Sequence, residues 1–350
     1  MPVLRYALVS ALALFIARAT FAPADDASVA ALPQYTPREH VSGTIRLWGH
    51  GSPTHDFMGR LVTYWEQGFN RYQPDAKFIG RMYGTASSIG ALYTGAGDLS
   101  IRGEEIHRPE ILAFERVFHY PPSSVDIATG SLNVRNMDFA QMFFVHKSNP
   151  LSKLTLAQLD AIFGCEHRRG LAPIHTWGQL GLSSDWSNKP INLYGWRIDD
   201  DFSSFLQQAI LNGSHKWNCK LNEFAHIYRP DGTIYDSGQQ ILDALAKDPY
   251  GIAVSNIRYA NPNVKALALA ANPGAPYYEA TKDTLIAQTY PLTRLIPAFY
   301  NRAPGKSMDP AVREFLCYIL SREGQADIVR DGGYLPLSKD AALRQLQKLQ

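Results

Sequence analysis

Hydroxyl groups that could contact a ligand gather in two short turns of this sequence. The segment 49–53 reads GHGSP, and the segment 84–88 reads GTASS. Ser52 is a favourable helix N-cap, and Pro53 suits the first position of a helix. The second turn has three hydroxyl groups, which is more than an ordinary strand-to-helix turn requires. Capping and turn formation remain structural alternatives to binding. The candidates are Ser52, Thr54, Thr85, Ser87 and Ser88.

Residues that could bind metals or act as nucleophiles do not form a known motif. The ten histidines and three cysteines show no H-x-x-x-H or C-x-x-C spacing, so we expect neither a metal site nor a cofactor. A hydrolase that uses a serine with His50 or His55 is an alternative, but a G-x-S-x-G motif is absent. Proximity in sequence also does not establish a Ser–His hydrogen bond. We therefore expect a protein without enzymatic activity.

The cysteines differ in their sequence surroundings. Cys317 lies among apolar residues at helical spacing, so we expect a buried free thiol. Cys165 and Cys219 lie in polar segments typical of loops. An oxidising compartment would let these two form a disulfide, although two unpaired loop cysteines explain the pattern equally well.

The elements around these residues alternate between strands and helices. A strand is expected at 44–48, and apolar residues at every fourth position from Phe57 to Phe69 predict a helix after it. The same order returns with a strand at 77–82, the second turn, a short helix and a strand at 99–101. Further strands are expected at 139–146 and 251–254, and helices at 155–163, 204–211 and 240–246. Such alternation favours an α/β class with parallel-type sheets.

The length of 350 residues is enough for two domains, each with its own core. Hydrophobic residues make up 45% and charged residues 19%, which excludes a disordered chain. The formal net charge is +2. Without Arg5 and Arg18, the 34 basic residues fall to 32 and equal the 32 acidic residues, so neither nucleic acid nor an anionic membrane is an expected partner.

The first 24 residues have the pattern of a secretory signal peptide. An arginine precedes an apolar run over 6–17, and Ala22-Pro23-Ala24 forms a cleavage site. Arg18 leaves the run too short to span a membrane. We therefore expect cleavage after Ala24, a periplasmic or secreted protein, and a flexible lead over 25–40. With no cysteine before Cys165, a lipid attachment point is absent near the cleavage site.

Five segments carry a resemblance to a known family. They are 49–53 (GHGSP), 84–92 (GTASSIGAL) with Gly97-Asp98, 144–164 (FVHKSNPLSKLTLAQLDAIFG), 250–254 (YGIAV) and 333–337 (GYLPL). In this order they resemble the phosphate-binding proteins of bacterial ABC importers, the PstS-like members of the type II periplasmic-binding-protein fold. The resemblance extends over residues 44–338, nearly all of the chain without its signal.

The resemblance implies a two-lobed α/β fold with a ligand cleft between the lobes. Lobe 1 would contain 41–137 and 290–350, lobe 2 would contain 138–289, and 290–299 would be the returning crossover. The implied function is a monomeric solute-binding protein that holds a small anion, either phosphate or a diverged ligand, and delivers it to an ABC permease. The alternative is an exported sensor or scaffold of the same fold that has lost tight phosphate binding.

The resemblance also implies ligand contacts outside the two turns. The family has an arginine followed by a Ser-Gly-Thr turn; here Arg197 matches, but the acids 199–201 replace that turn. Asp caps helices well, yet two like charges 4 Å apart cost about 4 kcal/mol at an effective dielectric of 20, so these acids oppose anion binding. An acidic residue that the family has after Asp98 is not matched. The further candidates are Arg102, Glu104, Arg197, Asp201 and Ser203.

Overall fold

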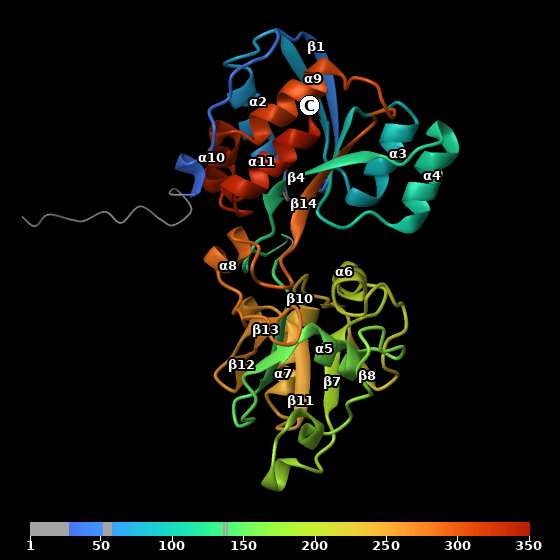
Figure 1. Ribbon diagram of the computed structural model, residues 1–350, viewed down its shortest axis with the longest axis vertical. Helices are drawn as coiled ribbons and strands as arrows, with labels where there is room; N and C mark the ends of the chain where they lie inside the picture. The colour runs from blue at the N-terminus through green and yellow to red at the C-terminus, as the bar shows by residue number, and fades with distance from the viewer. Residues whose placement is uncertain (1–27, 52–57, 136, 138) are drawn as a thin grey trace, which may run out of the picture.

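Two separate hydrophobic cores divide the chain into two parts, named lobe 1 and lobe 2 here (Figure 1). The computed structural model describes residues 28–51, 58–135, 137 and 139–350. The core of lobe 1 takes residues from 32–128 and 296–349, so both ends of the chain build it. The core of lobe 2 takes residues from 139–292, together with Leu335. The α/β class with two lobes is confirmed.

Lobe 1 contains a five-stranded sheet of mixed direction. Its order is β2-β1-β3-β14-β4, with β1 parallel to β2 and β3, and with β14 antiparallel to β3 and β4. The strands are β1 (Gly43–Gly49), β2 (Ala76–Arg81), β3 (Leu99–Ile101), β4 (Ser123–Thr129) and β14 (Leu295–Tyr300). The helices are α2 (Gly59–Phe69), α3 (Ser88–Tyr93), α4 (Arg108–Phe118), α9 (Pro310–Ile319), α10 (Arg322–Asp331) and α11 (Lys339–Lys348).

Lobe 2 contains a second five-stranded sheet, of order β12-β5-β11-β7-β8. Here β7 is parallel to β8 and β11, whereas β5 is antiparallel to β11 and β12, so both main sheets are mixed rather than parallel throughout. The strands are β5 (Met142–His146), β7 (Asn192–Trp196), β8 (Leu221–Phe224), β11 (Gly251–Ser255) and β12 (Val264–Ala266). The helices are α5 (Leu156–Phe163), α6 (Asp201–Ala209), α7 (Ser237–Leu245) and α8 (Lys282–Ile286).

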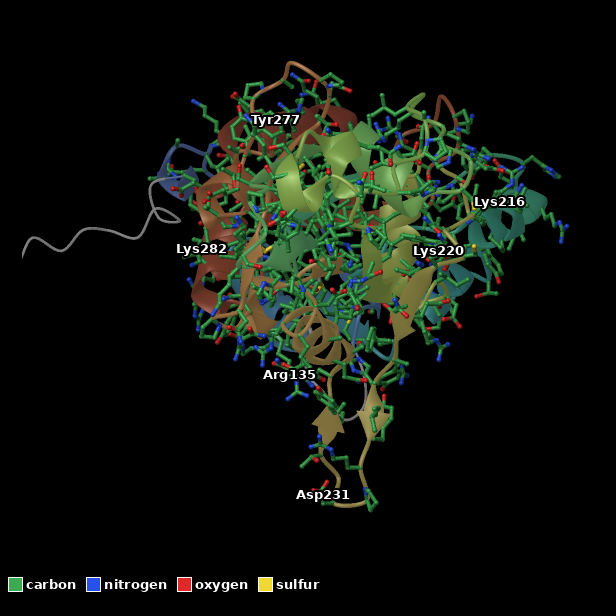
Figure 2. The ribbon with its side chains drawn as sticks, turned by 90° about the horizontal axis from the view of Figure 1, so that it is seen from below. Arg135, Lys216, Lys220, Asp231, Tyr277 and Lys282 are labelled. Carbon is green, nitrogen blue, oxygen red and sulfur yellow. The ribbon has the colours of Figure 1, made fainter. Side chains whose placement is uncertain are left out.

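Two short two-stranded sheets complete lobe 2. One pairs β6 (Lys153–Thr155) with β13 (Ala268–Ala270), and the other is the hairpin of β9 (Ile227–Tyr228) and β10 (Ile234–Tyr235). Figure 2 shows this hairpin projecting from the molecule with Asp231 at its tip. None of the helices in the described part of the chain is both long and apolar enough to cross a membrane.

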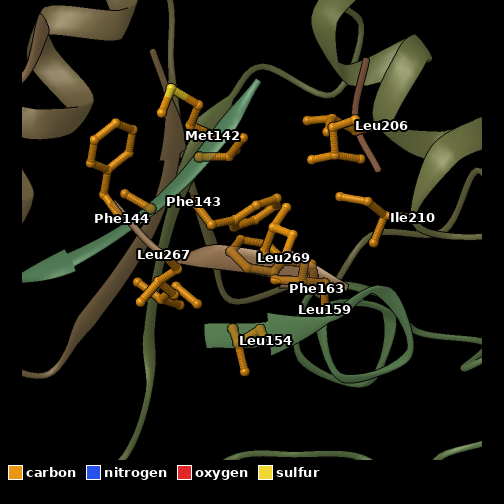
Figure 3. Packing of buried hydrophobic residues seen from close by; sticks show 14 of the residues in the cluster. Met142, Phe143, Phe144, Leu154, Leu159, Phe163, Leu206, Ile210, Leu267 and Leu269 are labelled. Carbon is orange, nitrogen blue, oxygen red and sulfur yellow. The ribbon is translucent and has the colours of Figure 1, made fainter. Parts of the chain in front are cut away.

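Apolar side chains from strands and helices interlock in the core of lobe 2 (Figure 3). Phe143 of β5 and Phe163 of α5 meet edge to face, with ring centroids 5.2 Å apart. The helix α5 begins with a capping box in which the Thr155 side chain accepts from the Gln158 N–H, and the Gln158 side chain accepts from the Thr155 N–H. This box explains why the helix starts where the sequence pattern predicts it.

Three sequence expectations about local structure need correction. The segment 28–40 is not a loose lead, because Leu32 and Tyr35 are buried and the Tyr35 hydroxyl donates to Glu314 at 2.8 Å. The N-cap of α2 is Met58, so that helix begins later than expected. Helix α6 begins earlier, because the Asp200 side chain caps it by accepting from the Phe202 N–H at 3.1 Å.

The disulfide between Cys165 and Cys219 is absent, and both are exposed free thiols. The backbone pairing explains this: the Cys165 N–H donates to the Lys216 carbonyl at 2.9 Å, so Lys216 rather than Cys219 lies opposite Cys165. A disulfide requires the two Cβ atoms to face each other at close range. Cys317 is a buried free thiol, as expected.

Candidate functional site

A cleft of about 680 Å³ lies where the two lobes face each other. His50 reaches it from lobe 1, just after β1. Lobe 2 contributes Asp201 and Phe202 from the start of α6, and His226 and Tyr228 from the hairpin region. The cleft therefore combines acidic, imidazole and aromatic groups with the guanidinium of Arg135, and most of these groups belong to lobe 2. Of the described candidates from the sequence, Asp201 lines this cleft, whereas Thr85 and Arg197 do not.

The described part of the first turn, residues 49–51, lies next to the second turn on lobe 1. The Gly84 N–H donates to the Gly49 carbonyl at 3.1 Å, and His50 Nδ1 lies 3.0 Å from Thr85 Oγ1. Gly84 has φ +146°, a conformation that favours glycine. A short 3₁₀ turn (Thr85–Ser87) then leads into α3. The structure thus brings together two segments that are separated by more than thirty residues in sequence.

The serines of the second turn use their hydroxyl protons within the turn. Ser87 donates to the Gly84 carbonyl at 3.0 Å, and Ser88 donates to the Thr85 carbonyl at 2.7 Å. Ser88 is also fully buried, whereas Ser87 is exposed. The turn is therefore pre-ordered, with Thr85 beside His50, and His50 lines the cleft. Ser52 and Thr54 lie outside the described residues.

Arg102 is fully buried, and protein acceptors occupy its guanidinium. Its guanidinium donates to both carboxylate oxygens of Glu110, at 2.7 and 3.0 Å, and to the Thr85 carbonyl at 3.3 Å. Such a bidentate pair occupies the guanidinium and fixes its geometry. Arg102 therefore supports the second turn from behind. Burial raises the pKa of the neighbouring Glu104 carboxyl, and the negative charge of Asp201 raises it further.

The start of α6 lines the same cleft as His50, through Asp201 and Phe202. Arg197 follows β7 and forms a two-point ion pair with Asp199, with Nε donating to Oδ1 at 2.7 Å. Both side chains are more than half exposed. Ser203 is buried and donates to the Arg197 carbonyl at 2.6 Å, so it fixes the loop rather than facing the cleft. Arg197 is therefore the exposed cation at this helix start.

The acids of α6 occupy the helix end that would otherwise attract an anion. Asp200 is the N-cap, and burial and the neighbouring Asp201 raise the pKa of Asp200 to about 7. The cap expected from the sequence is confirmed. Asp201 lines the cleft directly. A helix N-terminus favours negative charge, and here the carboxyl groups of the chain itself occupy that position.

Sequence reasoning missed three features of the site. Arg294 is buried between the lobes and contacts Glu105 and Asp201, although it lay inside the expected crossover 290–299. An aromatic cluster floors the cleft, with Phe139 and Trp196 each within 5 Å of Phe202 between ring centroids. The hairpin was missed too, although Asp-Gly between two apolar pairs, at 231–232, is a hairpin signal.

Two relatives with similar sequences come from bacteria, and one of them is a phosphate-binding protein by name. The phosphate-binding protein PstS of Pseudomonas aeruginosa is 30% identical over 321 residues, which cover 91% of this chain and 91% of that protein. Protein SphX of Synechococcus elongatus is 25% identical over 200 residues, covering 56% of this chain and 53% of that protein. No family model matches the chain.

Solved structures share the fold at lower identity. PstS from Borrelia burgdorferi has a TM-score of 0.55 at 14% identity, covering 85% of this chain and 100% of that one. An ABC-type phosphate transport receptor from Vibrio cholerae has a TM-score of 0.50 at 16% identity, covering 83% and 99%. The fold is thus that of the two-lobed type II periplasmic binding proteins. Given the identity to the Pseudomonas protein along most of its length, the chain belongs to the PstS family.

Proposed function

We propose that this protein is the exported phosphate-binding component of an ABC importer. The observation that supports it best is His50, which contacts Thr85 of the second turn and lines the cleft together with Asp201 of α6. A Pseudomonas relative named as a phosphate-binding protein supports the choice of ligand. We further propose a periplasmic location after cleavage of residues 1–24, which lie outside the described residues, and transfer of phosphate to a membrane permease.

The binding residues are proposed in two groups. Thr85, Ser87, Ser52 and Thr54 would hold phosphate oxygens on lobe 1, and Arg197 would supply the charge from lobe 2. Glu104, whose carboxyl pKa is raised by burial and by the charge of Asp201, would accept the proton of monohydrogen phosphate. Asp201 lines the cleft, where its charge would oppose the anion unless a cation compensates it. Ser88, Arg102 and Ser203 would keep these groups in position. The lobes would be 41–137 with 290–350, and 138–289, closing on the ligand by a hinge movement.

Calorimetric titration of the chain from Asp25 with phosphate and sulfate tests this proposal. We expect Arg197→Ala to weaken phosphate binding at least about tenfold, because charged hydrogen bonds contribute about 1.5–3 kcal/mol. Unfolding of the free protein should change little, since the Arg197–Asp199 pair is exposed. Arg168→Ala is the matched control, because Arg168 forms a similar exposed pair with Glu166.

Two results would contradict different parts of this proposal. If the unsubstituted protein binds neither anion, the sensor or scaffold alternative replaces the transport function. If phosphate binds but Arg197→Ala and Arg168→Ala behave alike, the function stands and the assignment of Arg197 is wrong.

A further inference from the structure

Arg294 lies at the junction of the two lobes, one residue before β14. The residue is only 2% exposed, and its side chain is 1% exposed. The chain passes here from lobe 2 back into the sheet of lobe 1 (Figure 1). A buried guanidinium is costly unless charged partners and hydrogen bonds compensate it. The charged partners of Arg294 therefore compensate the burial of its guanidinium.

On the lobe 1 side, Arg294 contacts the loop that follows β3. Its Nε and Nη2 atoms donate to the Glu105 carboxylate at 3.3 and 3.1 Å, and Nη2 also lies 3.4 Å from the Gly103 carbonyl oxygen. The same loop contains Glu104, and the negative charge of Asp201 in lobe 2 raises the pKa of the Glu104 carboxyl. This loop therefore lies within electrostatic range of the other lobe.

On the lobe 2 side, Arg294 contacts the start of α6. Its Nη1 atom lies 3.6 Å from Asp201 Oδ2, and its guanidinium carbon lies 5.5 and 5.2 Å from the ring centroids of Phe202 and Phe205. Aromatic faces attract a guanidinium electrostatically, and they also shield it from water. One side chain thus joins a carboxylate of each lobe.

We propose that Arg294 is a positioning residue that couples the two lobes and neutralises Asp201 at the cleft. Without this cation, Asp201 and Glu105 would place uncompensated negative charge beside the anion and would separate the lobes. The effect on affinity rests on the proposed function. The effect on lobe arrangement does not, because it is expected in the unliganded protein.

The test uses Arg294→Met, which keeps an unbranched apolar side chain in place of the aliphatic stem of arginine and removes the charge. Small-angle X-ray scattering of the unliganded protein should show a larger radius of gyration than that of the unsubstituted protein. Phosphate titration should show an affinity at least about tenfold weaker, as expected when one partner of a buried charge pair is removed. Arg294→Lys should have a radius of gyration and a phosphate affinity between those of Arg294→Met and the unsubstituted protein. The reason is that an ammonium cannot reach both carboxylates as a planar guanidinium does.

Arg169→Met is the matched control. Arg169 also contacts α6, donating to the Ala209 and Ile210 carbonyls at 2.7 and 2.6 Å, but it stays within lobe 2. This variant should lose stability without changing the radius of gyration. Adding Asp201→Asn to Arg294→Met should recover part of the phosphate affinity, because it removes the repulsion between the Asp201 carboxylate and the phosphate anion. The double variant should still have the larger radius of gyration. A purely structural role of Arg294 would not produce this split.

The proposal is overturned if Arg294→Met has the radius of gyration and the phosphate affinity of the unsubstituted protein. If Arg294→Met does not fold, Glu105→Gln provides the same test, because the Glu105 side chain is one-third exposed and tolerates the change. Absence of phosphate binding in the unsubstituted protein would reject the proposed function alone, since the scattering measurement still decides on the coupling of the lobes.

Discussion

The three consecutive aspartates before and within α6 occupy three different environments. Asp199 is exposed and pairs with Arg197, whose hydrogen bond lowers the pKa of the Asp199 carboxyl. Asp200 is the helix cap, with a pKa raised by burial. Asp201 faces the cleft and Arg294. Identical side chains therefore act as a surface partner, a cap and a cleft acid within half a helical turn.

Asp200→Asn should flatten the dependence of stability on pH. The folded state binds the Asp200 proton more tightly than the unfolded state, because the pKa rises from 3.8 to about 7. The contribution of this protonation to the free energy of unfolding is therefore complete below about pH 4 and is lost as the pH rises towards 7. Asn caps a helix as well as Asp but does not ionise. Urea unfolding at a series of pH values should show the variant to be more stable at pH 8, by at most about 4 kcal/mol.

The control for this experiment is Asp199→Asn. It removes the neighbouring carboxyl group, whose pKa is lowered rather than raised. The lowered pKa of Asp199 gives stability above its ordinary pKa that is lost as the pH falls, so this variant should not gain stability at pH 8. If the Asp200→Asn and unsubstituted curves run parallel from pH 4 to 8, the carboxyl of Asp200 is ionised in the folded protein throughout.

At the residue scale, the sequence predicted that an aspartate caps α6, but it did not predict that Arg102 is buried and paired with Glu110. The Asp run is a local signal, because a cap depends on the residues that directly follow it. Arg102 pairs with Glu110 on α4, and only the three-dimensional path of the loop between them brings the two together. A charged residue near a predicted site can therefore be a buried support.

At the element scale, helix α7 depends on the close approach of Gly238 to two aromatic rings. A Cβ atom at Gly238 would lie 2.3 Å from Tyr259 Cε2 and 2.7 Å from Trp196 Cη2. Both rings line the cleft. The absence of a side chain at this position lets α7 support the aromatic floor of the site.

Gly238→Ala should destabilise the protein, against the helix propensity of alanine. Propensity alone would favour Ala in a helix by about 0.8–1 kcal/mol. Overpacking against the two rings should outweigh this gain and cost about 1–3 kcal/mol. Gly90→Ala in α3 is the control, because the nearest atom to its added Cβ is the Tyr93 hydroxyl at 3.6 Å, an ordinary contact. Urea unfolding should show opposite signs for the two variants, and a stabilised Gly238→Ala would contradict this packing.

Regular periodicity made α2 and α5 predictable, because each has an apolar stripe set by its own residues. The hairpin of β9 and β10 has only two residues in each strand and no buried stripe, so apolar periodicity cannot reveal it. The spacing of apolar residues also could not predict that both main sheets mix parallel and antiparallel strands. Strand direction depends on which distant strands pair, as in β14 between β3 and β4.

At the scale of the whole molecule, the two lobes are built from the chain in different ways. Lobe 2 has a nearly continuous core, whereas lobe 1 joins segments from both ends of the sequence. The lobed connectivity came from the resemblance and not from periodicity, because hydrophobic spacing contains no information about pairing between residues 200 apart. Among the described contacts between the lobes is a buried arginine that joins Glu105 of lobe 1 to Asp201 of lobe 2.

Two cores of this kind should give separable unfolding transitions when one is weakened. Phe163→Ala in lobe 2 and Phe315→Ala in lobe 1 each remove a fully buried ring, at a cost of about 3–5 kcal/mol. Tryptophan fluorescence reports mainly on lobe 2, which has Trp177, Trp186, Trp196 and Trp217, whereas far-ultraviolet circular dichroism reports on both lobes. Phe163→Ala should therefore shift the fluorescence midpoint to lower urea than the dichroism midpoint.

Phe315→Ala is the matched variant in the other lobe, and it should leave the fluorescence midpoint above that of dichroism. A ligand held by both lobes should bring the two transitions together, because phosphate at 100 times its dissociation constant adds about 2.7 kcal/mol to the liganded state. Coincident midpoints in both variants without ligand would mean that the lobes unfold as one cooperative unit. In that case the interlobe contacts, with Arg294 among them, would be strong enough to transmit the loss of either core to the whole chain.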